Sequence, residues 1–222
     1  MTTWGQGGAP GVAFTILRLA VVTALGNRIH LCASEISTWG SQPSGEAVDQ
    51  SVWETSMLSS EKLRLLQRDQ HAHDLRNHFD ILSMHKTDRL KHYGLHFAKY
   101  VGRLARGSDE PKPIDRTLAD AFLVNLSAAN TLMQDLGKEE LIAHPFGPQV
   151  DSLRLFADAA GRFADACEKI DHMEEFTSIA KTANRDITEW LLWVAGERGI
   201  DLVQEVVDRR KELAARHFYI AD

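Results

Sequence analysis

The sequence predicts an all-α protein built as a multi-helix bundle, and three observations lead to this fold class. Over most of the chain after residue 59, apolar residues recur at the i, i+3/i+4, i+7 spacing of one helix face. No segment of any length alternates apolar and polar residues as a half-buried strand does. After residue 43, proline occurs only at positions 111, 113, 145 and 148, which leaves long uninterrupted helical segments between these breaks. Such segments bury their apolar stripes by packing on one another.

Residues 1–58 are predicted to form a separate N-terminal segment of one helix and a loop, whose role the sequence leaves open. Its apolar run, Val12–Leu25, is too short to cross a bilayer and carries Arg18 in its middle. No basic residue precedes this run, unlike in a secretory signal. We interpret it as a core or docking helix that ends at Gly26 and Asn27, and we expect no membrane association.

The net charge and the cysteine content bear on nucleic-acid binding and on the cellular location of the protein. A net charge of −6 over 222 residues argues against binding nucleic acid by bulk electrostatics, although a local basic patch remains compatible with it. The two cysteines, Cys32 and Cys167, have neither CxxC spacing nor the density of a secreted disulfide scaffold. The sequence therefore favours a cytoplasmic location.

From residue 59 to 222 we expect a helical bundle. Ser59 or Ser60 can cap one or two long helices running from about Glu61 to Arg106, with a break near Ser83–Thr87. Gly107 suits the C-terminal cap. The next helix is expected to start near Asp115 and to close at Gly137, and its apolar stripe consists of Leu118, Phe122, Leu126, Ala129, Leu132 and Met133.

Beyond the break at residues 145–148, three further helices are expected. The first begins at Asp151, the second starts near Asn184 and ends at Gly199, and Asp201 caps the third. The first two carry paired acids at i, i+3, a spacing that puts both side chains on one helix face: Glu168 with Asp171, and Asp186 with Glu189. If the two helices are antiparallel, the four carboxylates supply the hard oxygen ligands that Mg²⁺ or Mn²⁺ prefers.

The spacing of these acids resembles the MazG-like family of all-α nucleoside-triphosphate pyrophosphohydrolases, whose pattern is ExxE, a connection, and ExxD. Glu168-Lys-Ile-Asp171 is followed after fourteen residues by Asp186-Ile-Thr-Glu189. The run from Trp193 to Tyr219 is similar to the family's continuation, in which GIDL leads into a basic helix. The resemblance covers Gly161–Tyr219.

The resemblance implies a hydrolase that converts a nucleoside triphosphate to the monophosphate and pyrophosphate, with a nucleotide as its small-molecule partner and often a paired subunit such as a homodimer. It implies Mg²⁺ or Mn²⁺ held by the four acids, which would polarise the phosphates and activate a water. Glu168 or Glu174 would serve as the catalytic base. The residues expected to contact the substrate are Lys169, Lys181, Arg185 and Trp190.

Residues 59–143 resemble a weaker copy of the half that holds the acidic pairs, residues 149–222. Leu95–Gly107 and Arg116–Leu132 stand where the two metal helices would be, which makes the chain two tandem helical hairpins that mimic a pair of subunits. The acids are mostly replaced in this copy: Tyr100, Arg103 and Thr117 occupy three of the four positions, and Asp120 alone remains.

Two features leave a non-catalytic interpretation open. Asp171 stands where the family has Glu, and the acids of the second pair are in reversed order, so the ligand set is irregular. The same acids also fit an ordinary solvated helix face. The chain would then be a helical module that keeps the fold and binds a nucleotide or a protein partner.

Histidines supply a third alternative. His71, His78, His85 and His92 recur every seven residues, and His96 follows at i+4. In one continuous helix they form a stripe, and His92 and His96 with Asp120 would make a zinc or iron enzyme site in a bundle. The alternative is a half-buried helix face or an interface. Other polar candidates to face a ligand or solvent are Asn125, Ser127 and Asn130.

Overall fold

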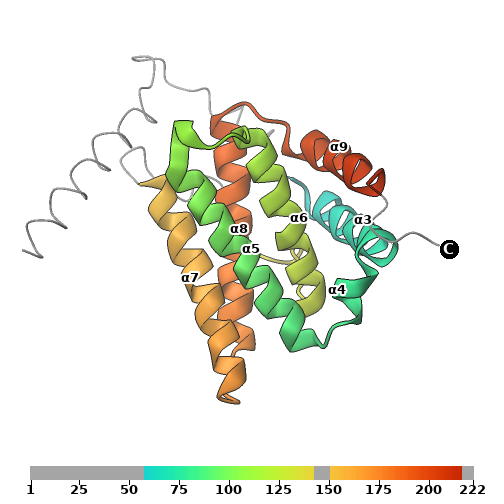
Figure 1. The fold of residues 1–222 in the computed structure, drawn as a ribbon, viewed down its shortest axis with the longest axis vertical. Helices are drawn as coiled ribbons and strands as arrows, with labels where there is room; N and C mark the ends of the chain where they lie inside the picture. The colour runs from blue at the N-terminus through green and yellow to red at the C-terminus, as the bar shows by residue number, and fades with distance from the viewer. Residues whose placement is uncertain (1–57, 143–150, 217–222) are drawn as a thin grey trace, which may run out of the picture. The chain divides into compact units, whose positions relative to one another are not determined.

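The computed structural model describes residues 58–142 and 151–216, and in these ranges every regular element is a helix, which confirms the all-α class. The chain divides into two compact units, and the described residues all belong to the second, Ala47–Asp222. The expected Val12–Leu25 helix and Cys32 lie outside the described residues. The described elements are α3 Ser60–Asn77, α4 Phe79–Ser83, α5 Lys86–Arg106, η2 Gly107–Asp109, α6 Ile114–Leu132, α7 Ser152–Asp171, α8 Thr177–Glu197 and α9 Leu202–Ala214 (Figure 1).

Four long helices form the central bundle. The hairpins α5–α6 and α7–α8 lie side by side, with α5 packed on α7 and α6 packed on α8 (Figure 1). Aromatic rings fill the seams: Phe97 meets Phe163 edge-on at 5.0 Å between ring centroids, and Phe156 meets Trp190 at 4.5 Å. The predicted pair of tandem hairpins is the observed arrangement, while its origin by duplication stays a hypothesis.

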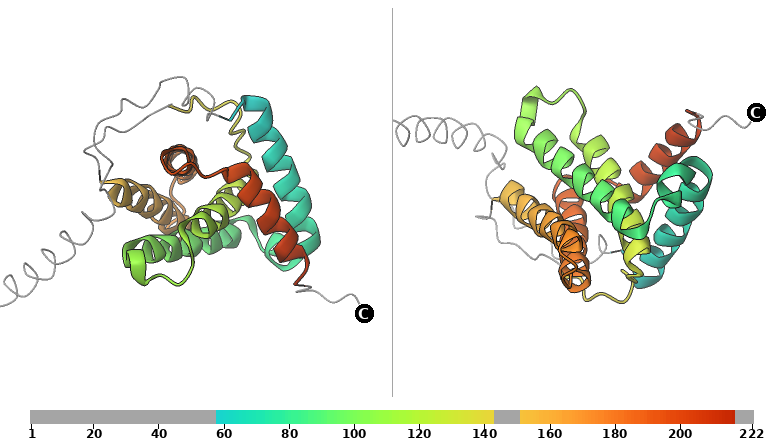
Figure 2. Two further views of the ribbon diagram at one scale, coloured as in Figure 1. Left: turned by 90° about the horizontal axis from the view of Figure 1, so that it is seen from above. Right: turned by 60° about the horizontal axis from the view of Figure 1, so that its bottom comes forward.

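The second layer consists of α3 and α9, which cross the side of the α5–α6 hairpin that faces away from α7 and α8 (Figure 2). Arg210 on α9 ties this layer together, because its guanidinium donates to Gln70 Oε1 at 2.8 Å and to the Leu66 carbonyl at 2.9 Å on α3. α6 therefore contacts α3, α5, α8 and α9 and is the most buried helix of the bundle.

A buried amide layer fixes the register between α6 and α8. Asn125 Nδ2 donates to the backbone and side-chain oxygens of Asn184, both at 2.8 Å, and Thr188 Oγ1 donates to Asn125 Oδ1 at 2.9 Å. Asn184 also donates to Gln134 Oε1 at 3.0 Å. Since an unpaired buried amide is costly, sliding one helix along the other would break several satisfied bonds at once. Asn125 and Asn184 are thus structural residues.

Most predicted helix ends are confirmed. Ser59, Asp151 and Asp201 each accept a hydrogen bond from the backbone N–H three residues on, and Gly107 and Gly199 adopt positive φ angles of 55° and 63° at C-terminal ends. These signals are local, so neighbouring sequence suffices to predict them.

Two helix ends differ from the prediction. α6 stops at Leu132 and not at Gly137, because Met133 takes the left-handed conformation with φ 51° and closes the last turn. α8 starts at Thr177 and not near Asn184, and Glu175 caps its first turn through Ser178 N at 3.1 Å. Asp186 and Glu189 consequently lie in the middle of α8.

The histidines do not form the stripe that one continuous helix would give, because the chain is broken into separate helices here. The predicted break near Ser83–Thr87 is confirmed, and a second break falls at His78, which is the C-cap of α3. His85 leaves the stripe because it caps α5, its Nδ1 accepting from Thr87 N at 3.4 Å. The seven-residue repeat therefore runs across three separate helices.

Candidate functional site

The first acidic pair lies at the exposed end of α7. Glu168 is 63% exposed at its side chain, and its carboxylate lies 3.0 Å from His172 Nε2, one helical turn on. Asp171 is 62% exposed and pairs with Lys91 of α5. Both carboxylates thus point outward to neighbours on the bundle surface.

The second acidic pair lies deeper and is neutralised by arginine. Asp186 accepts from Arg162 at 2.8 Å and from Arg185 at 2.9 Å. Glu189, with 7% of its side chain exposed, accepts from the Ile142 backbone N–H at 3.2 Å and lies 3.8 Å from Arg185. Burial raises the pKa of Glu189, and the Ile142 N–H and Arg185 partly offset this effect.

The helix register keeps the two acidic pairs apart. Asp186 lies opposite Arg162, which precedes Glu168 by six residues and hence by about 9 Å along α7. In the part of the chain that the structure describes, no three His, Cys, Asp or Glu side chains are grouped so as to hold a metal ion. The placed donors therefore do not fit a Mg²⁺ shared by Glu168, Asp171, Asp186 and Glu189.

Three of the side chains expected to contact the nucleotide, those of Lys169, Arg185 and Trp190, already bond to other residues. Lys169 and Glu174 pair at 2.9 Å near the α7–α8 turn. Trp190 is only 3% exposed, and its Nε1–H donates to the Ser152 carbonyl at 2.7 Å, so it is a core residue with no face free for stacking. Lys181 lies on α8, where its backbone carbonyl accepts from Gln134 at 2.9 Å.

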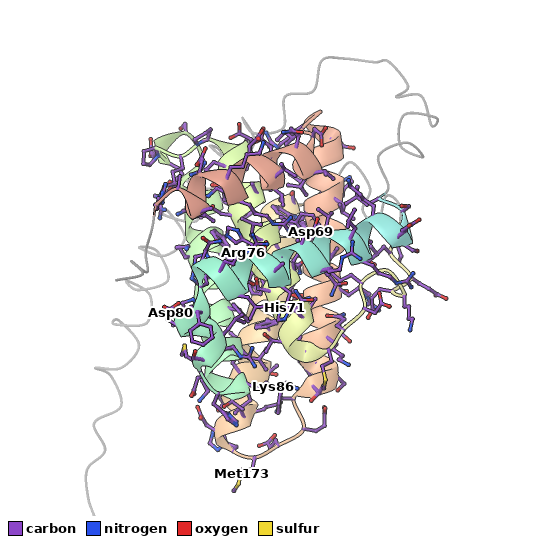
Figure 3. The ribbon with its side chains drawn as sticks, turned by 90° about the vertical axis from the view of Figure 1, so that its right-hand side faces the viewer. Asp69, His71, Arg76, Asp80, Lys86 and Met173 are labelled. Atoms are coloured by element: carbon purple, nitrogen blue, oxygen red, sulfur yellow. The ribbon has the colours of Figure 1, made fainter. Side chains whose placement is uncertain are left out.

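By contrast, His92, His96 and Asp120 line one cavity of about 500 Å³ between α5, α6 and the outer helices, which we call the α5–α6 cavity. Figure 3 views this side of the molecule, with α3 and α9 crossing the bundle and Asp80 on α4 at one edge. The polar lining residues are Gln70, Asp74, His78, Asp80, His92, Tyr93, His96, Lys99, Tyr100, Arg103, Lys112, Arg116, Asp120, Ser127, Arg209 and Arg216.

One end of the cavity, here called the basic end, is organised around Asp120. Arg103 Nη1 donates to Asp120 Oδ2 at 3.0 Å, and Arg209 Nε of α9 donates to Oδ1 at 2.6 Å. Arg116 lies 3.7 Å from the same carboxylate and pairs with Glu212 at 2.7 Å. Burial alone would raise the pKa of Asp120, but the hydrogen bond and charge of Arg209, the hydrogen bond of Arg103 and the charge of Arg116 outweigh it and lower this pKa.

Positive charge exceeds negative charge around the cavity. Its lining contains six Lys or Arg residues and three Asp residues, so with neutral histidines the excess is three positive charges. The Nε of Arg116 is buried without a hydrogen-bond partner among the described residues. Burial lowers the pKa of Lys99, and the neighbouring charge of Arg103 lowers it further. Cationic groups are therefore held together here against their own repulsion.

The opposite end, here called the Asp74 end, is acidic and hydrogen-bonded. Asp74 accepts from Gln70 Nε2 at 2.8 Å and from Ser127 Oγ at 2.6 Å. Burial raises the pKa of Asp74, and Ser127 partly offsets this effect. His78 and Asp80 also line the cavity, where α3 passes into α4.

The lining also has an apolar and aromatic part. It includes Tyr100 and the apolar residues Ile81, Leu82, Leu123, Val124 and Leu213. Burial raises the pKa of Tyr100 well above its usual range, so the phenol keeps its proton, and its oxygen lies 3.3 Å from His96 Nδ1. A flat or apolar part of a ligand fits between the two polar ends.

The alternative metal set does not fit a cation either. The rings of His92 and His96 lie 4.6 Å apart, but Lys99 Nζ stands 2.9 Å from His96 Nδ1. Burial, followed by the charge of Lys99, lowers the pKa of His96 to about 4. Both oxygens of Asp120 already accept from arginines. A metal ion would have to displace these cations, which favours an anion as the occupant.

Sequence reasoning identified His92, His96 and Asp120 but missed the basic residues around them. A usable signal was present on α5, where His92, His96, Tyr100 and Arg103 follow at steps of four, four and three and so share one face. Arg209 carried no such signal, because it reaches Asp120 from 89 residues away in the sequence. Ser127, considered as a residue that could face a ligand or solvent, lines the cavity.

Among the described helices, none combines the length and apolar character needed to cross a bilayer. Comparisons with protein-family models, with curated proteins and with solved structures found no significant match. The inference of function therefore depends on the geometry of the α5–α6 cavity.

Proposed function

We propose that this protein binds a small phosphorylated molecule of nucleotide size in the α5–α6 cavity, with the phosphate at the basic end. The observation that carries the proposal is the convergence of Lys99, Arg103, Lys112, Arg116 and Arg209 at that end. The compensating carboxylates bonded to these arginines are Asp120 and Glu212. A bound phosphate would supply the missing negative charge.

Guanidinium groups suit this role because their planar N–H donors match phosphate oxygens in pairs. Arg103 and Arg209 each donate to the Asp120 carboxylate through one guanidinium nitrogen. Glu212 accepts from Arg209 Nη1 at 3.1 Å, and the Nε of Arg116, buried without a hydrogen bond to any described residue, lies 3.7 Å from Asp120. A ligand phosphate would bond the N–H groups that these two carboxylates leave unused. The pre-positioned arginines lose little side-chain entropy when a phosphate binds.

Size and charge distribution support a small ligand over a polymer. A cavity of about 500 Å³ lies in the range of roughly 300–1,000 Å³ typical of small-molecule sites. The whole chain carries a net charge of −6, so the positive charge is local to the cavity. A cavity of this size can hold a small anion, whereas it is too small for a long polyanion.

Pyrophosphate release from a nucleoside triphosphate, as the MazG-like resemblance implies, remains a hypothesis. It would require Glu168, Asp171, Asp186 and Glu189 to come together around Mg²⁺. In the described arrangement Glu168 contacts His172, Asp171 contacts Lys91, and Asp186 and Glu189 share Arg185. Binding at the basic end requires no such rearrangement, and we therefore favour it.

Calorimetric titration of the full chain with AMP, ATP and inorganic phosphate, in the presence of EDTA, tests the proposal. Lys99→Met removes one ammonium without breaking an ion pair, since Lys99 contacts His96 and the ring of Tyr100. We expect nucleotide affinity to fall roughly tenfold in this variant, which is the typical worth of one charged hydrogen bond.

Lys138→Met is the matched control. Lys138 is a surface lysine beyond α6 that pairs with Asp135 at 3.8 Å and does not line the cavity. The nucleotide affinity of the Lys138→Met variant should equal that of the unmodified chain. Equal binding by Lys99→Met and Lys138→Met would contradict the proposal. Mg²⁺-dependent pyrophosphate release that disappears in Glu168→Ala would instead support the hydrolase.

A further inference from the structure

The Asp74 end of the cavity holds a carboxylate with unused acceptor capacity. Asp74 is 5% exposed, yet it lines the cavity. Its two oxygens accept one side-chain hydrogen bond each, from Gln70 and Ser127, whereas a carboxylate can accept about four. Gln70 donates from α3 and Ser127 from α6, and together they orient the carboxylate without using all of its acceptor capacity.

The buried position of Asp74 favours contact with a further hydrogen-bond donor. Burial dominates its environment and raises its pKa, which means that the charged carboxylate is under-solvated where it stands. Asp80 adds a second negative charge to this end of the lining. Asp69 and Arg76, labelled on α3 in Figure 3, do not line the cavity. A ligand donor would compensate the buried charge.

Helix geometry sets the distance between the two ends. Asp120 and Ser127 are seven residues apart on α6, so they share a face and are separated by about 10 Å along the helix. Leu123 and Val124 line the stretch between them. A free phosphate at the basic end cannot reach Asp74, but a nucleoside monophosphate can place its base over the apolar stretch and its edge near Asp74.

Building on the proposed function, we propose that Asp74 accepts a hydrogen bond from an amino group of the phosphorylated ligand. The ligand class is then a nucleotide whose base carries an exocyclic amine, such as an adenine or cytosine nucleotide. Bases that present a carbonyl oxygen at that position, such as hypoxanthine or uracil, would bring two acceptors together and leave the remaining acceptor capacity of Asp74 unused.

Matched nucleotide pairs test this inference on the full chain in EDTA. AMP and IMP differ in the exocyclic group and in the adjacent ring nitrogen, which is an acceptor in AMP and carries a proton in IMP. CMP and UMP differ in the same way, and ribose 5-phosphate lacks the base. We expect AMP and CMP to bind roughly tenfold more tightly than IMP and UMP. In Asp74→Asn, which keeps the size of the side chain, both ratios should fall to within about twofold while ribose 5-phosphate affinity is unchanged.

The outcomes separate this inference from the proposed function. Equal affinities for AMP and IMP in the unmodified chain would overturn the inference and leave phosphate binding intact, and this comparison requires no variant to fold. A preference that persists in Asp74→Asn would also overturn it, because the amine would be recognised elsewhere. Absence of binding by every compound, ribose 5-phosphate included, would overturn the proposed function and the inference together.

Discussion

Asp120 is the residue on which the basic end depends. It is buried, its side chain is 10% exposed, and it bonds Arg103 and Arg209 directly. Asp120→Asn keeps the volume but removes the charge between these arginines. Because breaking one side of a buried ion pair leaves uncompensated charge, we expect a loss of about 3–5 kcal/mol in the free energy of unfolding, measured by urea denaturation.

Asp158→Asn provides the comparison for Asp120. Asp158 pairs with Arg162 at 2.9 Å on the surface of α7, with 63% of its side chain exposed. Loss of this ion pair should lower the free energy of unfolding by less than about 1 kcal/mol. If Asp120→Asn cost no more than this control, Glu212 or solvent would have to compensate the arginines, and the account of the basic end would need revision.

Buried histidines should make stability depend on pH. Burial, followed by the charge of His78, lowers the pKa of His73 to about 4, and the pKa of His96 is also about 4. Since the unfolded chain has pKa values near 6.5, it binds more protons than the folded chain between about pH 4 and 6.5. The free energy of unfolding should therefore fall as pH decreases through this window, by roughly 3 kcal/mol at pH 4 from His73 alone.

Urea denaturation at pH 7.5, 5.5 and 4.5 measures this dependence. His73→Gln should flatten the decline, because the substituted amide does not titrate. His71 lies on the same helix but is exposed, so the His71→Gln variant should retain the decline in stability at low pH. An unchanged slope in His73→Gln would show that other groups cause the acid sensitivity.

At the scale of the element, α6 ends on a strained residue. Met133 is 80% exposed and has φ 51°, while its N–H and that of Gln134 close the helix on Asn130 and Ala129. Glycine adopts this left-handed conformation without steric cost. We expect Met133→Gly to raise the free energy of unfolding by about 0.5–1 kcal/mol, measured by urea denaturation.

Met133→Ala distinguishes relief of backbone strain from loss of the exposed side chain. Alanine has a Cβ atom and therefore retains the strain, so it should give no comparable gain. A gain of the same size from both substitutions would assign the effect to the methionine side chain instead.

At the scale of the whole molecule, the fold separates acids that the sequence puts close together. Glu168 and Asp171 lie at the end of α7, while Asp186 and Glu189 lie midway along α8. Adding millimolar Mg²⁺ should therefore change the melting temperature by less than about 1 °C, since a ligand stabilises only when it binds the folded state preferentially. A larger rise that disappears in Glu168→Ala would mean that these acids converge around the ion.

The sequence by itself determined the helical class, the helix starts at Ser59, Asp151 and Asp201, and the candidate trio of His92, His96 and Asp120. These depend on periodicity and on neighbours within a few residues. Only the tertiary structure decided which charges meet, because that depends on how far each helix slides along its partner. Arg209 reaches Asp120 across 89 residues, and Ser127 reaches Asp74 across 53. One turn of slippage moves a side chain by about 5.4 Å, enough to replace an expected metal site by separate contacts of each acid with its own neighbours.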